Sequence, residues 1–442
     1  MAKKDIIAHK EIIEGLSRNF NRILEKFGVS DTPSLKGFST RDLGLGNIYT
    51  EVVRCAFEYR LSRDPPDMSN RELNFLVKFF VPRDKDRPGF LYAGRESPLT
   101  MENYQLQFLK GLDYFLQPIS LKRMDGLRIF DYAGEETAEK KLEGKSQEEK
   151  KDIVLGLIQE IRKFHSLAND RLKKYVSKYG KIPSYLRHGQ DIGTEKALDN
   201  LRAIFGKDKI EELPAEIIEA WPKAYSPIDD CFEDELEMAH GDIQLANILY
   251  HNRESSDDSE AEGREKIIFF SPKLTLIDQW FDIDSLFASH GLDFSPRDRE
   301  VILEQILSEE AERSYSPRGL SGFLRRKLKL TEGARQELYS ISHRRVVDRA
   351  LRKLGKNADV SRLYPETWES WRRNRPSSFL SCNNDCRKTI NTTLREIIRD
   401  PSNYKLSPSE TDRLSDLLGI LDKYAVLVPR EDKMPYANPK GI

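Results

Sequence analysis

The chain has 442 residues, of which 38% are hydrophobic and 33% charged, and its 21 Phe, 17 Tyr and 4 Trp can fill a core. This composition excludes a chain that is disordered throughout, because enough apolar surface is available for burial. Lys and Arg number 72 and Asp and Glu 73, so the net charge of −1 argues against a basic coat for nucleic acid.

Three further features concern the compartment of the protein. No apolar run approaches the roughly 18 residues of a membrane-spanning helix, and the charged start MAKKDIIAHK lacks the apolar region of a secretory signal. The four cysteines are too few for a disulfide scaffold in a chain of this length. We therefore expect a cytoplasmic protein without a membrane partner.

Residues 1–35 are predicted to form an N-terminal helical segment, because apolar residues such as Phe20, Ile23 and Leu24 recur at helical spacing ahead of Gly28. The residue pattern then changes and predicts a β-rich lobe over residues 36–132. Strands separated by a single helix predict a small, mainly antiparallel sheet. The strands are expected within 48–61, 72–82 and 127–134, and the helix within 101–112.

Residues 133–442 are predicted to form a large helical lobe. Its first long helix opens with a capping box of Ser146 and Glu149, and a later one begins with Ser407 as its N-cap. The order of elements predicts an α+β fold with two lobes, the small β-rich one first. Later helices are expected at 300–312, 334–355, 386–399 and 408–423.

One short β-like island interrupts the helical lobe. It comprises residues 246–250 and 273–281, which we expect to pair as a hairpin. The acidic segment between them, 251–266, is interpreted as the tip of that hairpin.

The most informative motif, HGDIQLANILY, begins at residue 240 and runs into the first stretch of this β-like island. His240 and Gly241 precede Asp242, and Asn247 lies five positions beyond the aspartate. A hydroxyl that attacks a γ-phosphate needs a carboxylate to orient it and accept its proton, and Mg²⁺ needs oxygen ligands. The spacing H-x-D-x-x-x-x-N supplies both from one loop. Asp278, which follows four β-compatible residues, is the expected second metal ligand.

With these residues the sequence resembles the aminoglycoside phosphotransferase / choline kinase superfamily, over roughly residues 36–290. HGDIQLANIL is similar to the HGDxxxxN signature of that family, and LIDQW to its metal-binding strand. The resemblance implies a protein-kinase-like fold that uses ATP and Mg²⁺. It implies that Asp242 is the catalytic base, that Asn247 and Asp278 bind Mg²⁺, and that His240 shapes the catalytic loop.

The β-rich lobe carries further residues of this resemblance. Gly44, Gly46 and Asn47 resemble the glycine turn between the first two strands of the family, where backbone approaches phosphate. Lys78 lies in a strand among apolar neighbours, where an unpaired ammonium is costly. The family's strand lysine holds the nucleotide phosphates, and Glu102 is its expected helix partner, with Glu96 as the competitor.

Other family features are carried over in the same way. The backbone near Phe130 and Tyr132 would contact the adenine, and His165 is expected to pack behind the catalytic loop. Asp282 and Asp284 are both candidates for the carboxylate that supports this loop, and the sequence does not choose between them.

Several remaining features receive structural interpretations. We expect Trp280 and Phe281 to be packing residues, and a zinc site at Cys382 and Cys386 is disfavoured because a second ligand pair is missing. The basic runs 325–330 and 343–356 are predicted to be solvated helix faces rather than a nucleic-acid patch. The acidic stretch 229–237 either attracts a cationic acceptor or is solvated, and the second is favoured.

The resulting hypothesis is an ATP- and Mg²⁺-dependent phosphotransferase that acts on a hydroxyl of an unidentified small molecule. We expect Lys78, Asp242, Asn247 and Asp278 to line one cleft between the lobes. The alternatives are a protein-directed kinase and a pseudokinase-type binding or regulatory protein on the same fold.

Overall fold

The described residues of the chain form two compact units. Unit 1 takes its described residues from 1–136 and 249–270, and unit 2 takes its own from 137–248, 271–368 and 376–442. Residues 249–251 and 266–270, which the sequence predicts in the helical lobe, thus cluster with unit 1. The computed structural model describes residues 14–29, 31–47, 50–65, 67–80, 98–118, 127–132, 134, 136–188, 194–229, 237–251, 266–278, 280–313, 332–363 and 379–428.

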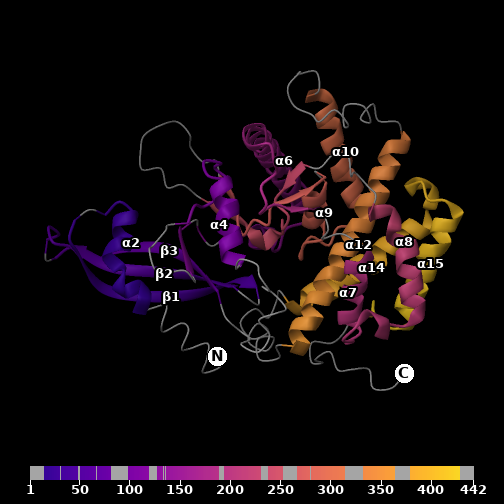
Figure 1. Cartoon of the computed structure of the whole chain (residues 1–442), viewed down its shortest axis with the longest axis horizontal. Coiled ribbons are helices and arrows are strands. Elements are labelled where there is room, and N and C mark those ends of the chain that lie inside the picture. Colours follow the sequence, from indigo (N-terminus) through magenta and orange to yellow (C-terminus); the bar gives the residue numbers. More distant parts are fainter. Residues whose placement is uncertain are drawn as a thin grey trace. The chain divides into compact units, whose positions relative to one another are not determined.

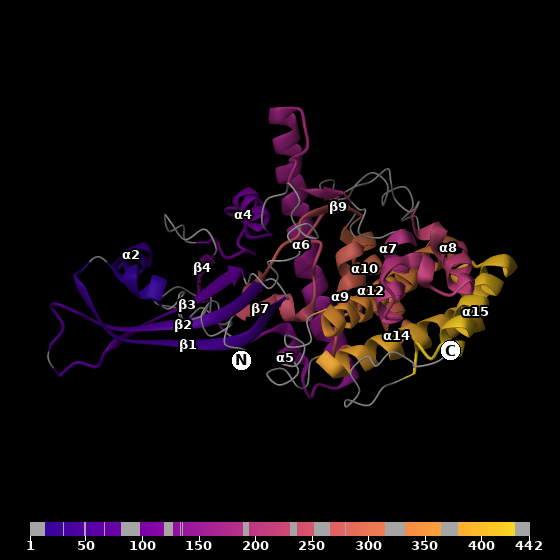
Figure 2. The same cartoon turned by 60° about the horizontal axis from the view of Figure 1, so that its bottom comes forward.

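Unit 1 is built on a four-stranded antiparallel sheet in the order β1-β2-β3-β4, which Figure 1 and Figure 2 show beside the short helix α2. All three stretches predicted as strands are strands, which confirms the β-rich part of the predicted α+β fold. The strands are β1 (Pro33–Asn47), β2 (Thr50–Leu61), β3 (Arg71–Phe80) and β4 (Leu127–Asp131).

The position of the glycines differs from the expectation. Gly44 and Gly46 lie within β1 rather than in a turn, and Asn47 pairs with Thr50, so the connection to β2 follows the glycines. The pairing register shifts between Asp42 and Leu45. Glycine in a strand is typical of such a bulge, because it tolerates the irregular backbone.

The apolar core of unit 1 lies on one face of the sheet. Because side chains alternate between the two faces of a strand, the odd-numbered residues of β2 and β3 point to α2 (Phe20–Lys26). The rings of Phe20 and Phe57 meet edge to face at 5.0 Å. The buried residues of this face are Leu16, Phe20, Ile23, Leu24, Val53, Cys55, Phe57, Tyr59, Leu61, Phe75, Val77 and Ile129.

The opposite face of the sheet carries Lys78, which alternates with Val77 along β3. Phe270, which follows β8, packs there against Phe130 at 5.7 Å between ring centroids. β8 (Lys266–Phe269) pairs with β7 (Ile248–His251) in a separate two-stranded sheet. The helix α4 (Pro98–Phe108) is the single helix expected within this lobe.

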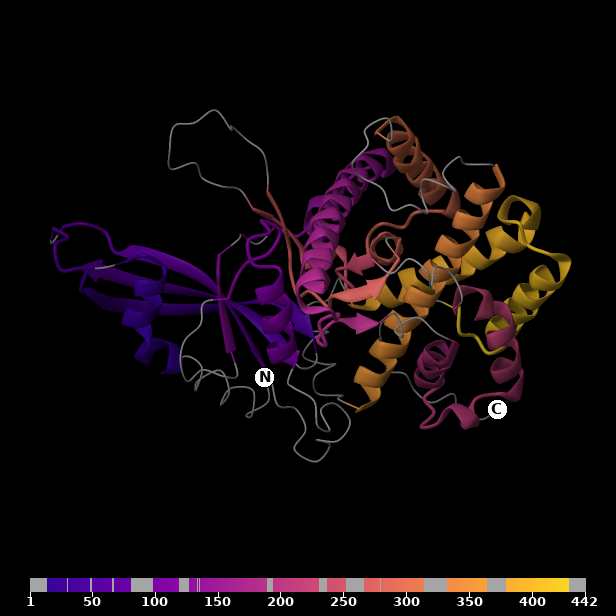
Figure 3. The same cartoon turned by 45° about the horizontal axis from the view of Figure 1, so that its top comes forward.

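Unit 2 is largely helical (Figure 3), which confirms the second half of the predicted fold class. The predicted capping box of Ser146 and Glu149 is present, and Ser407, the predicted N-cap of a later helix, forms a capping box with Glu410. Its α-helices are α5 (Ala138–Leu142), α6 (Gln147–Tyr179), α7 (Thr194–Ile204), α8 (Ala215–Asp229), α9 (Phe281–Phe287), α10 (Pro296–Arg313), α12 (Glu332–Leu363), α14 (Phe379–Arg399) and α15 (Pro408–Lys423). The 3₁₀ segments are η1 (Ile210–Glu212), η3 (Leu245–Asn247) and η4 (Pro401–Tyr404).

The expected hairpin of the β island is wrong in its pairing. β9 (Thr275–Ile277) pairs with β5 (Arg187–His188) and with β6 (Glu237–Ala239), whereas β7 pairs with β8. The short strands β6 and β8 were not predicted, because three or four residues are too few to display a period. Residues 252–265, the proposed hairpin tip, lie outside the described residues.

The basic run on α12 is also unlike its prediction. Arg344, Arg345 and Arg349 are buried rather than solvated, because α12 packs against α7, α9 and α14 and has few open sides (Figure 1). Residues 325–330, the other basic run, lie outside the described residues. In the described part of the chain, no helix combines the length and apolar character needed to cross a membrane.

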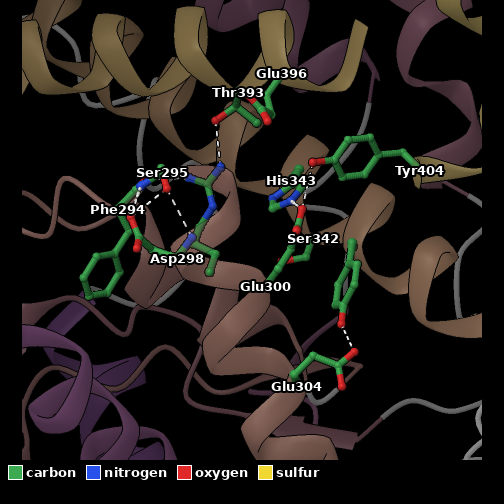
Figure 4. Close-up of polar contacts among 12 residues, drawn as sticks. Phe294, Ser295, Asp298, Glu300, Glu304, Ser342, His343, Thr393, Glu396 and Tyr404 are labelled. Atoms are coloured by element: carbon green, nitrogen blue, oxygen red, sulfur yellow. Dashed lines mark hydrogen bonds and ion pairs between the residues drawn. The ribbon is translucent and has the colours of Figure 1, made fainter. Parts of the chain in front are cut away.

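A buried polar cluster joins α10, α12 and η4 (Figure 4). Glu300 accepts hydrogen bonds from His343 Nε2 at 3.0 Å and from Tyr404 Oη at 2.7 Å. Burial lowers the pKa of His343 to about 4, so a neutral ring donates its Nε2–H to the carboxylate. The cluster ties three elements of unit 2 together and is interpreted as structural.

Candidate active site

The predicted catalytic loop leaves β6 at His240 and enters η3 at Leu245. Gly241 has φ of 80°, in the left-handed region that favours glycine. A Cβ at this position would lie 2.1 Å from the Lys273 carbonyl oxygen. Any side chain would therefore strain the backbone and collide with the chain before β9, which explains the glycine between His240 and Asp242.

Asp282 on α9 holds this loop from behind. Its carboxylate accepts the backbone N–H of His240 at 2.6 Å and of Gly241 at 3.0 Å, and His165 Nε2 lies 2.8 Å away. Burial alone would raise the pKa of Asp282, but the hydrogen bonds and the neighbouring histidines lower it. Asp282, and not Asp284, is thus the loop-supporting carboxylate, and His165 packs behind the loop as expected.

Asp242 presents its carboxylate in a charged and partly open setting. Oδ2 accepts from Lys273 Nζ at 2.5 Å and Oδ1 from Gln244 Nε2 at 2.9 Å, and about 20% of the side chain is exposed. Burial disfavours the carboxylate, yet the Lys273 ammonium outweighs it and holds the pKa of Asp242 well below its usual range. Asp242 is therefore ionised at neutral pH.

His240 supports the loop from inside unit 2. Its ring is fully buried, and its Nδ1 accepts the backbone N–H of Asp242 at 3.3 Å. Burial lowers the pKa of His240 to about 4, so the ring is neutral and suited to accept this hydrogen bond. These contacts fit the loop-shaping role expected for His240.

Asn247 closes the loop. Its Nδ2 donates to the backbone carbonyl of Asp242 at 2.9 Å, and its own N–H donates to the Gln244 carbonyl at 2.8 Å. With the amide nitrogen engaged, the amide oxygen is the atom available to a metal ion.

Asp278, at the end of β9, is held by an arginine of α12. Its Oδ1 accepts from Arg345 Nη1 at 2.8 Å and from the Trp280 N–H at 3.0 Å, and its Oδ2 accepts from Arg345 Nη2 at 2.6 Å. Both side chains are buried. Trp280 and Phe281 are buried beside Asp278, as expected for packing residues.

The same guanidinium serves a second carboxylate. Asp284 Oδ2 lies 3.5 Å from Arg345 Nη1, and Asp284 Oδ1 accepts from Ser342 Oγ at 2.5 Å. Burial, reinforced by the nearby charge of Asp278, raises the pKa of Asp284 to about 7, although Arg345 opposes this shift. Asp278 and Asp284 thus share one cation.

The donor atoms suit Mg²⁺, which prefers oxygen ligands. Asn247 offers an amide oxygen, and an ionised carboxylate offers about four lone-pair positions, of which Arg345 and Trp280 use three at Asp278. The residues fit the ion in donor type, while Arg345 competes for the same carboxylate. Among the described residues, no three His, Cys, Asp or Glu side chains are grouped to hold a metal ion by themselves.

In unit 1, Lys78 meets the anion that its strand position requires. Lys78 Nζ lies 2.6 and 2.8 Å from the two carboxylate oxygens of Glu102 on α4, and 5.3 Å from the centroid of the Phe270 ring. Glu102 is therefore the helix partner, and Glu96 lies outside the described residues. Both side chains are nearly buried, so the pair has few solvent contacts.

The expected adenine-contacting segment ends β4. Phe130 is buried, which leaves its backbone rather than its ring for a ligand. The Tyr132 ring lies under the Arg54 guanidinium at 5.0 Å, and the Tyr132 N–H donates to Asp131 Oδ1 at 2.8 Å. For Gly44, Gly46 and Asn47 only the backbone in β1 is described, and their nucleotide contacts stay predictions.

Sequence reasoning missed the two cations that partner the predicted aspartates. Lys273 lies two residues before β9, the strand that leads to Asp278, and its backbone N–H also donates to the His240 carbonyl at 2.9 Å. A lone lysine just before a buried strand is a weak signal. Arg345 carries no local signal at all, because its partner is 67 positions away.

Two weaker sequence hypotheses fall largely outside the described residues. Residues 230–236, most of the acidic stretch, are among those left undescribed. The same holds for the Cys382 side chain, whereas Cys386 is buried on α14.

The chain matches no family model and no curated protein sequence. Solved structures similar to it include choline kinase LicA from Streptococcus pneumoniae, with a TM-score of 0.41 and 11% identity over 86% of this chain and 99% of that one. Another is an ethanolamine kinase from Plasmodium vivax, with a TM-score of 0.39 and 10% identity over 80% of this chain and 82% of that one.

Proposed function

We propose that this chain is an ATP- and Mg²⁺-dependent phosphotransferase that transfers a phosphoryl group to a hydroxyl of a small molecule. The observation that supports this most is the loop from His240 to Asn247. It presents an ionised, partly exposed carboxylate and, five positions later, an amide oxygen, and Asp282 holds the loop by two backbone hydrogen bonds. Such fixed positioning is the main requirement of phosphoryl transfer.

In this proposal Asp242 orients the acceptor hydroxyl and takes its proton. Lys273 keeps Asp242 ionised through its contact at 2.5 Å. In the proposal the same ammonium also stabilises negative charge that develops on the transferring group. Lys273 is therefore assigned a catalytic role beside the base.

Several of the predicted residues are proposed to contact the nucleotide. Lys78, held by Glu102, would contact the phosphates, and the backbone near Gly44, Gly46 and Asn47 would approach them. The backbone near Phe130 and Tyr132 would contact the adenine. Asn247 and Asp278 would hold Mg²⁺, which neutralises phosphate charge when bound.

ATP hydrolysis tests this proposal without a known acceptor, because water can replace the hydroxyl. We expect Asp242→Asn to lower the ATP turnover rate by about 10²–10⁴-fold while nucleotide affinity stays near that of the wild type. Asp152→Asn, at an exposed position of α6, is the matched control and should turn over ATP normally. An Asp242→Asn protein as fast as the wild type would remove Asp242 as the base.

One observation favours the pseudokinase alternative. Arg345 already engages both oxygens of Asp278, so a metal ion must compete with a buried guanidinium. A wild-type protein that binds nucleotide equally well with and without Mg²⁺, and does not turn over ATP, would support a binding protein instead.

A further inference from the structure

Asp284 offers the guanidinium of Arg345 a second carboxylate. Asp284 lies on α9 and is 1% exposed, and its Oδ1 accepts a hydrogen bond from Ser342 Oγ at 2.5 Å. Its Oδ2 is also buried, and within the described part of the chain this oxygen accepts no hydrogen bond. A buried carboxylate oxygen without a donor is costly. Asp284 Oδ2 is therefore an open acceptor position beside a cation.

The distances show how close Arg345 is to this open position. Its Nη1 lies 3.5 Å from Asp284 Oδ2, while the same nitrogen donates to Asp278 Oδ1 at 2.8 Å. A contact about 0.5 Å shorter would be a full hydrogen bond to Asp284. Ser342 and Arg345 are three positions apart on α12, so they lie on one side of the helix and approach Asp284 together. A small movement of the guanidinium therefore changes its partner.

The charges of this set favour a second cation. Asp278 and Asp284 are both buried, and the Arg345 guanidinium contacts both carboxylates. A metal ion on Asp278 would supply a second positive charge, but it would repel the guanidinium from that carboxylate. A buried cation that loses its partner is strongly destabilising. Asp284 removes this cost, because it can accept the displaced guanidinium.

We propose, on the basis of the proposed function, that Arg345 is the counter-ion of Asp278 in the absence of metal and passes to Asp284 when Asp278 takes up Mg²⁺. Asp284 is thereby a positioning residue of the metal site, which acts through Arg345 and does not contact the metal itself. The exchange keeps the buried guanidinium paired in both states. It also sets the Mg²⁺ concentration at which the nucleotide binds, because the metal has to displace a guanidinium that holds both oxygens of Asp278.

Calorimetry of ADP binding at increasing Mg²⁺ concentrations tests this exchange. The measured quantity is the Mg²⁺ concentration that gives half of the increase in ADP affinity, at pH 8, where Asp284, with its pKa raised to about 7, is ionised. Arg345→Gln removes the competing cation and should lower this concentration by about tenfold. Asp284→Asn removes the second partner of Arg345 and should raise it by about tenfold, because a charge-assisted hydrogen bond is lost.

The double variant separates the exchange from a direct attraction between Asp284 and the metal ion. In the Arg345→Gln background, Asp284→Asn should raise the half-saturating Mg²⁺ concentration by only about twofold, because the guanidinium that it would receive is gone. A direct attraction acts in either background. An effect of Asp284→Asn that is equal or larger in the Arg345→Gln background would therefore overturn the inference. Asp152→Asn, at an exposed position of α6, is the matched control and should bind as the wild type does.

Crystal structures of the wild type with ADP, in the presence and absence of Mg²⁺, test the exchange without any variant. With Mg²⁺ bound, the distance from Arg345 Nη1 to Asp284 Oδ2 should shorten from 3.5 Å to that of a hydrogen bond. An Arg345 that still holds both oxygens of Asp278 while ADP and Mg²⁺ are bound would overturn the inference and leave the proposed phosphotransferase function intact. ADP binding that does not depend on Mg²⁺ in the wild type would contradict the proposed function and, with it, the inference.

Discussion

Each unit of the molecule buries an ion pair made by residues predicted to bind nucleotide or metal, and the two pairs differ in their charge balance. In unit 1, one ammonium, Lys78, meets one carboxylate, Glu102. In unit 2, one guanidinium, Arg345, lies between two carboxylates, Asp278 and Asp284. The pair in unit 1 is balanced, with one cation for one carboxylate, whereas the set in unit 2 is unbalanced, with one carboxylate more than it has cations. Burial, reinforced by the charge of Asp278, raises the pKa of Asp284, and a proton on Asp284 removes that excess of negative charge.

The largest effect on stability is expected when Arg345 is removed from the unbalanced set. Arg345→Met should lower the free energy of unfolding by about 3–5 kcal/mol, because two carboxylates then stay buried without their cation. Urea denaturation at neutral pH measures this. Arg395→Met is the matched control, since Arg395 pairs with Asp422 at the surface, where 57% and 43% of the two side chains are exposed. Equal losses in both variants would contradict the burial argument.

The second effect concerns the proton on Asp284. Its pKa is raised to about 7, whereas an unfolded aspartate ionises near ~3.9. The folded protein therefore holds a proton that the unfolded chain has released, and the free energy of unfolding contributed by Asp284 falls as pH rises from about 4 to 7. Asp284→Asn lacks this fall, so its stability relative to the wild type should rise by roughly 2–4 kcal/mol between pH 5 and 8.

Denaturation curves at pH 5, 6, 7 and 8 for both proteins give this difference directly. Asp152→Asn, at an exposed site of α6, controls for the loss of a carboxylate and should run parallel to the wild type. A parallel profile for Asp284→Asn as well would show that Asp284 is ionised in the folded protein.

The smallest loss of stability is expected for a substitution in the balanced pair. Glu102→Gln keeps the shape of the side chain and one acceptor for Lys78, so we expect a loss of only about 1–3 kcal/mol. Glu216→Gln is the control, because the Glu216 and Lys423 side chains are 47% and 58% exposed, and such pairs contribute about 0–1 kcal/mol. Thermal or urea unfolding measures both. A loss for Glu102→Gln larger than that for Arg345→Met would reverse the comparison.

The two ion pairs also differ in whether the sequence could predict them. Glu102 lies 24 positions from Lys78 on the helix expected in that lobe, so a strand lysine and a helix glutamate could be matched from the sequence. The partner of Asp278 lies 67 positions away on α12, in a run of basic residues that resembles an ordinary solvated face. Charge alone does not tell which arginine of that run reaches a buried acid.

The sequence by itself determined the features that involve residues close to one another along the chain. The capping boxes at Ser146 and Ser407 are contacts between a residue and one three positions on, so composition and spacing suffice to predict them. The same holds for the strands β2, β3 and β4 with the helix α4 between them, and for the spacing of Asp242 and Asn247, which belong to one loop.

Only the tertiary structure decided the rest. It selected Asp282 over Asp284 as the support of the loop, and it brought Lys273 to Asp242 and Arg345 to Asp278. These choices depend on which side chain reaches across β9, α9 and α12 once the helices have packed. Two aspartates two positions apart look alike in the sequence, whereas burial gives one of them three hydrogen-bond donors and the other a proton.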